Sequence, residues 1–182
     1  MAGVSEPHDA VDDVDEVDGI VAAWRRERSD LDVEPLQVLS RLDRLAGVLS
    51  NRRAAIFARH GLRRHEFDVL AVLRRAGAPF ELTAGELAAR TYVTSGTMTS
   101  RLDGLTERGL VTRGPDRVDG RLVRVALTPA GRAVLDAAFG ELIETERQLL
   151  TPLGDAARST LAGHLRSLLA SVTSDPAETI AP

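Results

Sequence analysis

The chain has 182 residues, of which 43% are hydrophobic and 27% are charged, and its formal net charge at pH 7 is −4. This length fits one domain with extensions, and the hydrophobic fraction is enough to bury a core. The chain has no cysteine, which excludes disulfides, cysteine-ligated zinc and thiol redox switches. No apolar run approaches the roughly 18 residues that a membrane span needs, and the acidic start lacks the plan of a signal peptide. We therefore expect a cytoplasmic protein with no membrane partner.

The charge is unevenly distributed along the chain. Residues 35–128 carry 16 Arg and 9 acidic residues, whereas residues 1–34 carry 3 Arg and 11 acidic residues. Residues 129–182 are again acidic, with 4 Arg and 7 acidic residues. A basic middle between acidic ends is typical of a polyanion-binding module. Because all 23 basic residues are arginine, chance clustering in an arginine-rich chain is an alternative explanation.

The first part of the chain is predicted to be an acidic tail followed by two helices. Residues 1–18 are expected to be disordered, because they are acidic and poor in apolar residues. Residues 19–28, GIVAAWRRER, predict a short helix with Trp24 on its apolar side. A long helix is predicted from Pro35 to Arg59, since proline is well placed in a first turn. Its apolar stripe consists of Leu36, Leu39, Leu42, Leu45 and Leu49.

The middle of the chain predicts three more helices. Residues 64–77 are apolar on almost all sides, which indicates a central, buried helix. Residues 82–91 predict a short helix in which Thr83 and Glu86 form a capping box. Residues 92–111 predict a further helix that has an unusual number of hydroxyl side chains in its first turns.

The remaining pattern predicts a hairpin and two final helices. Residues 110–128 alternate on either side of a tip rich in Pro, Asp and Gly, which is a hairpin signal. Amphipathic helices are predicted over residues 129–150 and 155–173. The expected fold is mainly α (α+β): a winged helix-turn-helix with a two-stranded wing, flanked by N- and C-terminal helices. The expected divisions are a tail (1–18), first helices (19–62), winged module (63–128), last helices (129–174) and a loose tail (175–182).

The hydroxyl-rich helix is the first candidate site. A helical wheel places Met98, Leu102 and Leu105 on one side, which therefore faces the core. The opposite side and its flanks are small and polar, and can enter a major groove about 12 Å wide. The candidate DNA-binding residues there are Thr94, Ser95, Gly96, Thr97, Thr99 and Ser100. The alternative is an ordinary solvated face with Thr94 as a helix cap.

The hairpin tip is the second candidate site for DNA. Its sequence GPDRVDGR contains Arg117 and Arg121. An arginine at such a tip can insert into a narrow minor groove, where the negative potential is deepest. The alternative is a local salt bridge to Asp116 or Asp119.

These motifs together carry a family resemblance. The run VTSGTMTSRLDGLTERGLVTRGPDRVDGRLVRVALTPAG resembles the MarR family of bacterial transcriptional regulators, and the resemblance extends over about residues 35–172. It implies a homodimer whose N- and C-terminal helices interlock and hold two winged modules over a pseudo-palindromic DNA operator. Such a dimer would obstruct polymerase, which favours a repressor. Two residues depart from the family pattern: Gly120 replaces a second wing arginine, and Gly104 lies in the middle of the recognition helix.

Three residues suggest a small-molecule site. Trp24 lies in a helix that a minimal winged-helix regulator does not need, Asp68 interrupts an apolar helix, and Arg101 flanks the buried side of the recognition helix. The trio resembles the urate-responsive subgroup of the family. That resemblance implies that urate or another purine contacts the three residues, displaces the recognition helix and releases DNA. The alternatives are a purely structural role, with Asp68 paired to Arg101, Arg64 or Arg75, and a phenolic or other aromatic anion as effector.

An enzyme is not expected. The four histidines, His8, His60, His65 and His164, have neither the spacing of metal ligands nor a catalytic order with Ser and Asp. No glycine-rich loop of the phosphate-binding type is present, so neither a metal nor a cofactor is predicted. A protein-interaction module that docks through the acidic N-terminus is the remaining alternative. It leaves the hydroxyl-rich helix and the arginine-tipped hairpin unexplained.

Overall fold

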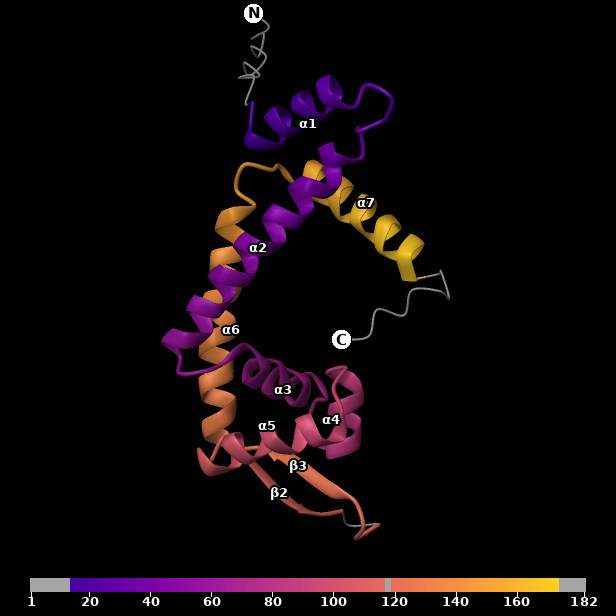
Figure 1. Cartoon of the computed structure of the whole chain (residues 1–182). Coiled ribbons are helices and arrows are strands. Elements are labelled where there is room, and N and C mark those ends of the chain that lie inside the picture. The colour runs from indigo at the N-terminus through magenta and orange to yellow at the C-terminus, as the bar shows by residue number, and fades with distance from the viewer. Residues whose placement is uncertain (1–13, 117–118, 174–182) are drawn as a thin grey trace, which may run out of the picture. The chain divides into compact units, whose positions relative to one another are not determined.

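The computed structural model describes residues 14–116 and 119–173 (Figure 1). The predictions for residues 1–13, for Arg117 and for the tail 175–182 therefore lie outside the described residues. The chain divides into two units, residues 1–52 and 53–182. In chain order the elements are α1 (Glu16–Glu27), α2 (Leu36–Arg59), α3 (Arg64–Arg75), β1 (Glu81–Thr83), α4 (Ala84–Arg90), α5 (Ser95–Glu107), β2 (Val111–Pro115), β3 (Val123–Leu127), α6 (Pro129–Leu149) and α7 (Asp155–Thr173).

The first unit holds α1 against the beginning of α2. Val17 and Val21 of α1 are buried together with Val33, and Leu36 packs against them. α1 begins at Glu16 rather than at the expected Gly19, because Asp15 and the Asp18 side chain form a capping box. The acidic residues just before Gly19 thus belong to the first turn of a helix, where negative charge is favourable.

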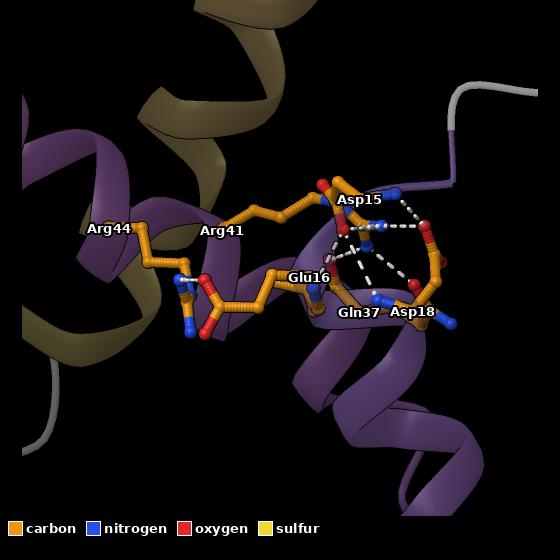
Figure 2. A network of polar contacts seen from close by, with 7 residues as sticks. Asp15, Glu16, Asp18, Gln37, Arg41 and Arg44 are labelled. Atoms are coloured by element: carbon orange, nitrogen blue, oxygen red, sulfur yellow. Dashed lines mark hydrogen bonds and ion pairs between the residues drawn. The ribbon is translucent and has the colours of Figure 1, made fainter.

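Arginines of α2 pair with the capped end of α1 (Figure 2). Arg41 Nε donates to Asp15 Oδ2 at 2.8 Å, and its Nη2 lies 2.8 Å from Asp18 Oδ2. Arg44 pairs in the same way with Glu16. A small valine core and an exposed ionic cluster therefore hold the two helices of the first unit together.

The core of the second unit is built around α3. As predicted, α3 is buried on most sides, and its buried apolar residues are Phe67, Val69, Leu70, Val72 and Leu73. Phe57, near the end of α2, stacks on Phe67 with ring centroids 4.1 Å apart. α5 adds three buried side chains to the same core, Met98, Leu102 and Leu105. The winged module is therefore organised around one central helix.

The sheet is antiparallel and has the order β1-β3-β2. The sequence predicted only the β2–β3 hairpin, which we call the wing, and β1 is a third strand that was missed. β1 has three residues, too few to show an alternating pattern, and it pairs Leu82 with Val125 of β3. Thr83 ends β1 and also caps α4, with its backbone N–H donating to Glu86 Oε2 at 2.7 Å. The predicted capping box is confirmed.

Two further findings complete the fold. α5 lies beside β2 of the wing, so the helix and the hairpin form adjoining parts of one surface (Figure 1). Within the described ranges, no helix combines the length and the apolarity that a bilayer span requires.

Candidate functional site

The first turns of α5 present small polar groups to solvent. The N-cap Thr94 accepts a hydrogen bond from the backbone N–H of Thr97 at 3.2 Å, and the two hydroxyls lie 3.0 Å apart. The exposed residues that follow are Ser95, Gly96, Thr97, Thr99 and Ser100. Met98 between them is buried, so the predicted division into a core side and a polar side is confirmed. Free backbone N–H groups at such a helix start also favour a phosphate.

The wing is shaped by a buried carboxylate. Asp116 is 7% exposed and accepts a hydrogen bond from Arg124 Nε at 2.6 Å. The backbone N–H of Asp119 also donates to Asp116, and that of Arg121 donates to Asp119 Oδ1, each at 3.0 Å. Within the described residues the Arg121 guanidinium makes no ion pair, so the alternative of a local salt bridge does not apply to it. Arg121 is exposed next to the tip, available to a polyanion.

Arg113 of β2 joins the wing to α5. Its Nη2 lies 2.9 Å from Asp103 Oδ1 and donates to the backbone carbonyl of Thr99 at 3.2 Å. Its Nε is buried and has no hydrogen-bond partner among the described residues. The sequence analysis did not identify Arg113. The strand alternation that puts it on the same side as the buried Val111 could have found it.

The C-terminal end of α5 is fixed by a second arginine that the sequence analysis did not identify. Arg108, the C-cap of α5, donates from Nη1 to both carboxylate oxygens of Glu66 at 3.0 Å. Its Nη2 donates to the carbonyl of Gly61 at 2.7 Å. Glu66 is only 6% exposed and also accepts from the backbone N–H of Arg63 at 2.8 Å. The middle and the C-terminal end of the DNA-binding candidate helix are thus tied to other elements.

The three predicted ligand residues lie on three different helices. Asp68 of α3 is exposed, so the desolvation cost expected for a charge on this apolar helix does not arise. Arg101 of α5 is half-buried, and no ion pair joins it to Asp68 in the described structure. Trp24 of α1 belongs to the first unit and is 49% exposed. The joint role of the trio stays a prediction.

Two of these residues affect the pKa of a histidine that the sequence analysis set aside. Burial lowers the pKa of His65, and the Arg101 guanidinium lowers it further, whereas the Asp68 carboxylate acts in the opposite direction. Asp68 and Arg101 are therefore both close enough to His65 to influence its charge. No sequence signal indicated this, because the proximity depends on the packing of α5 against α3.

The second unit contains a cavity of about 380 Å³ between α3, the α4–α5 turn and α6. Its apolar lining includes Phe67 and Val72 of α3 and Leu135 and Phe139 of α6. Its charged and aromatic lining includes Asp68, Arg75, Arg90 and Tyr92. Arg74 also lines the cavity, but its Nε donates to Asp136 at 3.0 Å. Such a mixture of apolar walls and a few charged groups is typical of a small-molecule site. In the described part of the chain, no group of three or more His, Asp or Glu could hold a metal ion.

Comparisons with known proteins identify the family of the chain. The MarR family model matches residues 60–122. The HTH-type transcriptional regulator PecS of Dickeya dadantii is 38% identical over 157 residues, which cover 86% of this chain and 92% of PecS. Among solved structures, a MarR family protein from Bacillus stearothermophilus has a TM-score of 0.66 at 24% identity, covering 79% of this chain and 99% of its own.

A second solved structure contains nucleic acid. A mutant of MarR from E. coli, complexed with operator DNA, has a TM-score of 0.58 at 26% identity and covers 76% of this chain and 99% of its own. The likeness to PecS extends over most of both chains, and the winged-helix fold is shared with the solved structures. The chain therefore belongs to the MarR family of DNA-binding transcriptional regulators.

Proposed function

We propose that the chain is a homodimeric repressor that binds a pseudo-palindromic operator and releases it when a small aromatic anion binds. The observation that carries the DNA part is the exposed, hydroxyl-bearing start of α5 beside a wing on which Arg121 is exposed. In this arrangement α5 enters the major groove and Arg121 reaches the adjacent backbone or minor groove. The similar fold of an E. coli MarR mutant that was crystallised with operator DNA supports DNA as the partner.

Exposed apolar side chains support a second copy as partner. In the second unit, five large apolar residues are between 43% and 64% exposed: Phe139 and Ile143 of α6, and Leu168, Leu169 and Val172 of α7. In the first unit, Leu39 and Leu45 of α2 are 56% and 52% exposed. Apolar faces on this scale favour association with another chain. A two-fold pair would present two α5 helices to half-sites about one helical turn apart.

The effector response is proposed from the cavity and its charged neighbours. Its volume of about 380 Å³ lies at the small end of the range for ligand pockets. Asp68, Thr91 and Tyr92 line the cavity, and Thr91 and Tyr92 belong to the turn that leads into α5, so an occupant beside Asp68 would also lie against this turn. Urate or another purine is the proposed effector, with Trp24, Asp68 and Arg101 as contacts. An effector that binds tenfold more tightly to the geometry that cannot bind DNA shifts the equilibrium toward that geometry by about 1.4 kcal/mol.

A release experiment tests this proposal. A duplex selected by the full chain from a random pool would be bound in a gel shift and titrated with urate, xanthine and salicylate. We expect release by a purine from the wild type and retention of DNA by Arg101→Ala. Arg147→Ala is the matched control, because Arg147 is an exposed arginine of α6 whose side chain pairs only locally with Glu144. No release by any of the three compounds, or release from Arg101→Ala equal to that from the wild type, would contradict the effector assignment.

The same assay separates the remaining alternatives. Release by salicylate alone would assign a phenolic rather than a purine effector. A protein-interaction module would show no duplex binding whose log affinity falls steeply with log salt. A chain that is monomeric at the concentrations at which it binds the duplex would exclude the two-fold arrangement.

A further inference from the structure

Tyr92 occupies a backbone position that does not suit its side chain. It lies in the turn between α4 and α5 with φ of 54°, in the left-handed region that bulky residues rarely adopt. Glycine or asparagine would fit this position with less strain. The ring is 78% exposed, so burial in the core does not offset the strain.

A second residue with positive φ shows what such compensation looks like. Phe80 has φ of 62°, and its ring lies under two guanidinium groups, with Arg74 at 5.0 Å and Arg132 at 5.2 Å from the ring centroid. The ring of Phe80 therefore has partners that stabilise its position. Tyr92 has no ring contact of this kind among the described residues. The backbone turn itself is an ordinary helix end, in which the Tyr92 N–H donates to the carbonyl of Ala89 at 3.3 Å, but this turn makes no use of the phenol ring. The ring is therefore available to a ligand.

The Tyr92 side chain borders the cavity of the second unit. Arg90 and Thr91 line the cavity with it, and Arg75 lies on the α3 side. Arg75 Nε donates only to the carbonyl of Ala71, at 3.3 Å, and neither Arg75 nor Arg90 has an ion-pair partner in the described structure. A phenol ring beside two such cations matches a planar anion, which can stack on the ring while its charged group pairs with an arginine.

The same turn sets where α5 begins. The backbone N–H of Val93 donates to the carbonyl of Ala88 at 3.1 Å, and Thr94 is the N-cap of α5. Only Val93 separates Tyr92 from that cap. A ligand that draws the Tyr92 ring toward the cavity therefore acts on the backbone that leads directly into the DNA-binding helix.

We propose that Tyr92 is a ligand-contacting residue that makes the cavity selective for aromatic over aliphatic anions and couples its occupancy to the start of α5. The inference rests on the proposed effector response and names its route and specificity. Tyr92 contributes the flat wall of the site, and Arg75 and Arg90 contribute the positive charge.

The chain offers an unusually direct test, because Tyr92 is its one tyrosine. Full-length protein labelled with 3-fluorotyrosine gives a single fluorine NMR resonance, which reports on this ring alone. The probes are urate and salicylate, with acetate at equal ionic strength as the aliphatic control. We expect a saturable shift with at least one aromatic anion and none with acetate. The absence of any shift would overturn the inference.

Three substitutions separate the ring from the backbone strain. Calorimetry should show that Tyr92→Gly and Tyr92→Asn, which both suit the turn, bind the active anion about tenfold more weakly, while Tyr92→Phe stays within about threefold of wild type. If the glycine and asparagine variants bind the anion as tightly as the wild type does, the proposal is overturned. Weaker DNA binding by these variants with unchanged anion affinity would assign Tyr92 to the DNA instead, and would also overturn it.

These experiments distinguish a failure of the role proposed for Tyr92 from a failure of the proposed effector response. A fluorine shift without release of DNA would uphold the role of Tyr92 in anion binding and refute the effector response. Release of DNA by urate, with no fluorine shift and with equal release from Tyr92→Gly, would refute the role of Tyr92 and leave the effector response standing.

Discussion

The guanidinium of Arg113 is shared between the side chain of Asp103, 2.9 Å away, and the backbone carbonyl of Thr99, to which it donates at 3.2 Å. Asp103 and Thr99 lie one turn apart on α5, whereas Arg113 projects from β2 of the wing. This one side chain therefore sets the angle between the two parts that are proposed to enter the major groove and reach the adjacent backbone. A rigid connection of this kind reduces the conformational entropy that DNA binding must remove.

Replacing Arg113 by alanine should loosen this connection. We expect about 1–2 kcal/mol of lost stability, since hydrogen bonds to charged groups contribute on this scale, and roughly tenfold weaker binding to the selected duplex. Chemical denaturation and a gel shift measure the two effects. Thr112→Ala, at the exposed neighbouring position of β2, is the control. Unchanged affinity in Arg113→Ala would show that the wing and α5 bind independently.

The Glu66–Arg108 pair should behave as a buried charge pair. Glu66 is 6% exposed in the wild type and Arg108 is partly exposed, so Arg108→Ala, which removes the cation beside this carboxylate, should cost about 1–3 kcal/mol. The double variant Glu66→Gln/Arg108→Ala removes the charge as well, and glutamine can still accept from the Arg63 N–H. Urea denaturation should therefore find the double variant more stable than Arg108→Ala. A double variant that is less stable would contradict this account.

Two glycines of α6 give a matched comparison. A Cβ added at Gly131 would lie 2.0 Å from the backbone carbonyl oxygen of Leu110, which cannot move without displacing the start of β2. Gly131→Ala should destabilise the chain by about 1–3 kcal/mol through overpacking. At Gly140 an added Cβ meets no atom within 4 Å, so Gly140→Ala should stabilise the helix by about 0.5–1 kcal/mol. Thermal unfolding measures both, and equal midpoints would contradict the close approach at Gly131.

The wing and α5 should affect DNA binding in different ways. Arg121→Ala should weaken binding to all duplexes and reduce the salt dependence, because a backbone or minor-groove contact carries little sequence information. Changes at Ser95, Thr97 or Ser100 should alter the preferred sequence more than the overall affinity. Competitive selection from a random duplex pool distinguishes the two. If Arg121→Ala binds as tightly as wild type, the wing has no role in affinity.

The features that could be predicted from the sequence are local ones. The burial of Met98 and Leu102 and the capping box of Thr83 and Glu86 depend on residues three or four apart, and helical periodicity displays them. The contact of Arg113 with Asp103 and the effect of Arg101 on His65 join residues ten or more positions apart, which only the packing of the folded chain brings close.

Other differences between the predicted and the observed structure arise from short or ambiguous sequence signals. β1 was missed because it has three residues and takes its pairing from β3. The start of α1 was placed too late because Asp15 and Asp18 were interpreted as part of an acidic tail, although acidic residues are also the ordinary caps of a helix. Asp68 was expected to need a partner, and instead it is exposed at the rim of a cavity.

The attachment of α1 to α2 should depend on pH. Hydrogen bonds from Arg41 hold the pKa of both Asp15 and Asp18 below the usual 3.8, and one from Arg44 holds that of Glu16 below the usual 4.5 (Figure 2). Because these pKa values are lower in the folded protein, the pairs stabilise it fully above the ordinary values. That contribution is lost as the pH falls through the lowered ones.

The emission of Trp24, the one tryptophan of the chain, reports on α1 directly. We expect it to change on acidification before the far-UV circular dichroism of the whole chain does, because α1 is held by a small valine core and these pairs, whereas the second unit has a much larger core. Arg41→Ala should shift this emission change toward neutral pH, and salt should act in the same direction by screening. Arg52→Ala, an exposed arginine of α2 without an ion pair among the described residues, is the control. An identical acid transition in Arg41→Ala and wild type would mean that the valine contacts alone hold α1 in place.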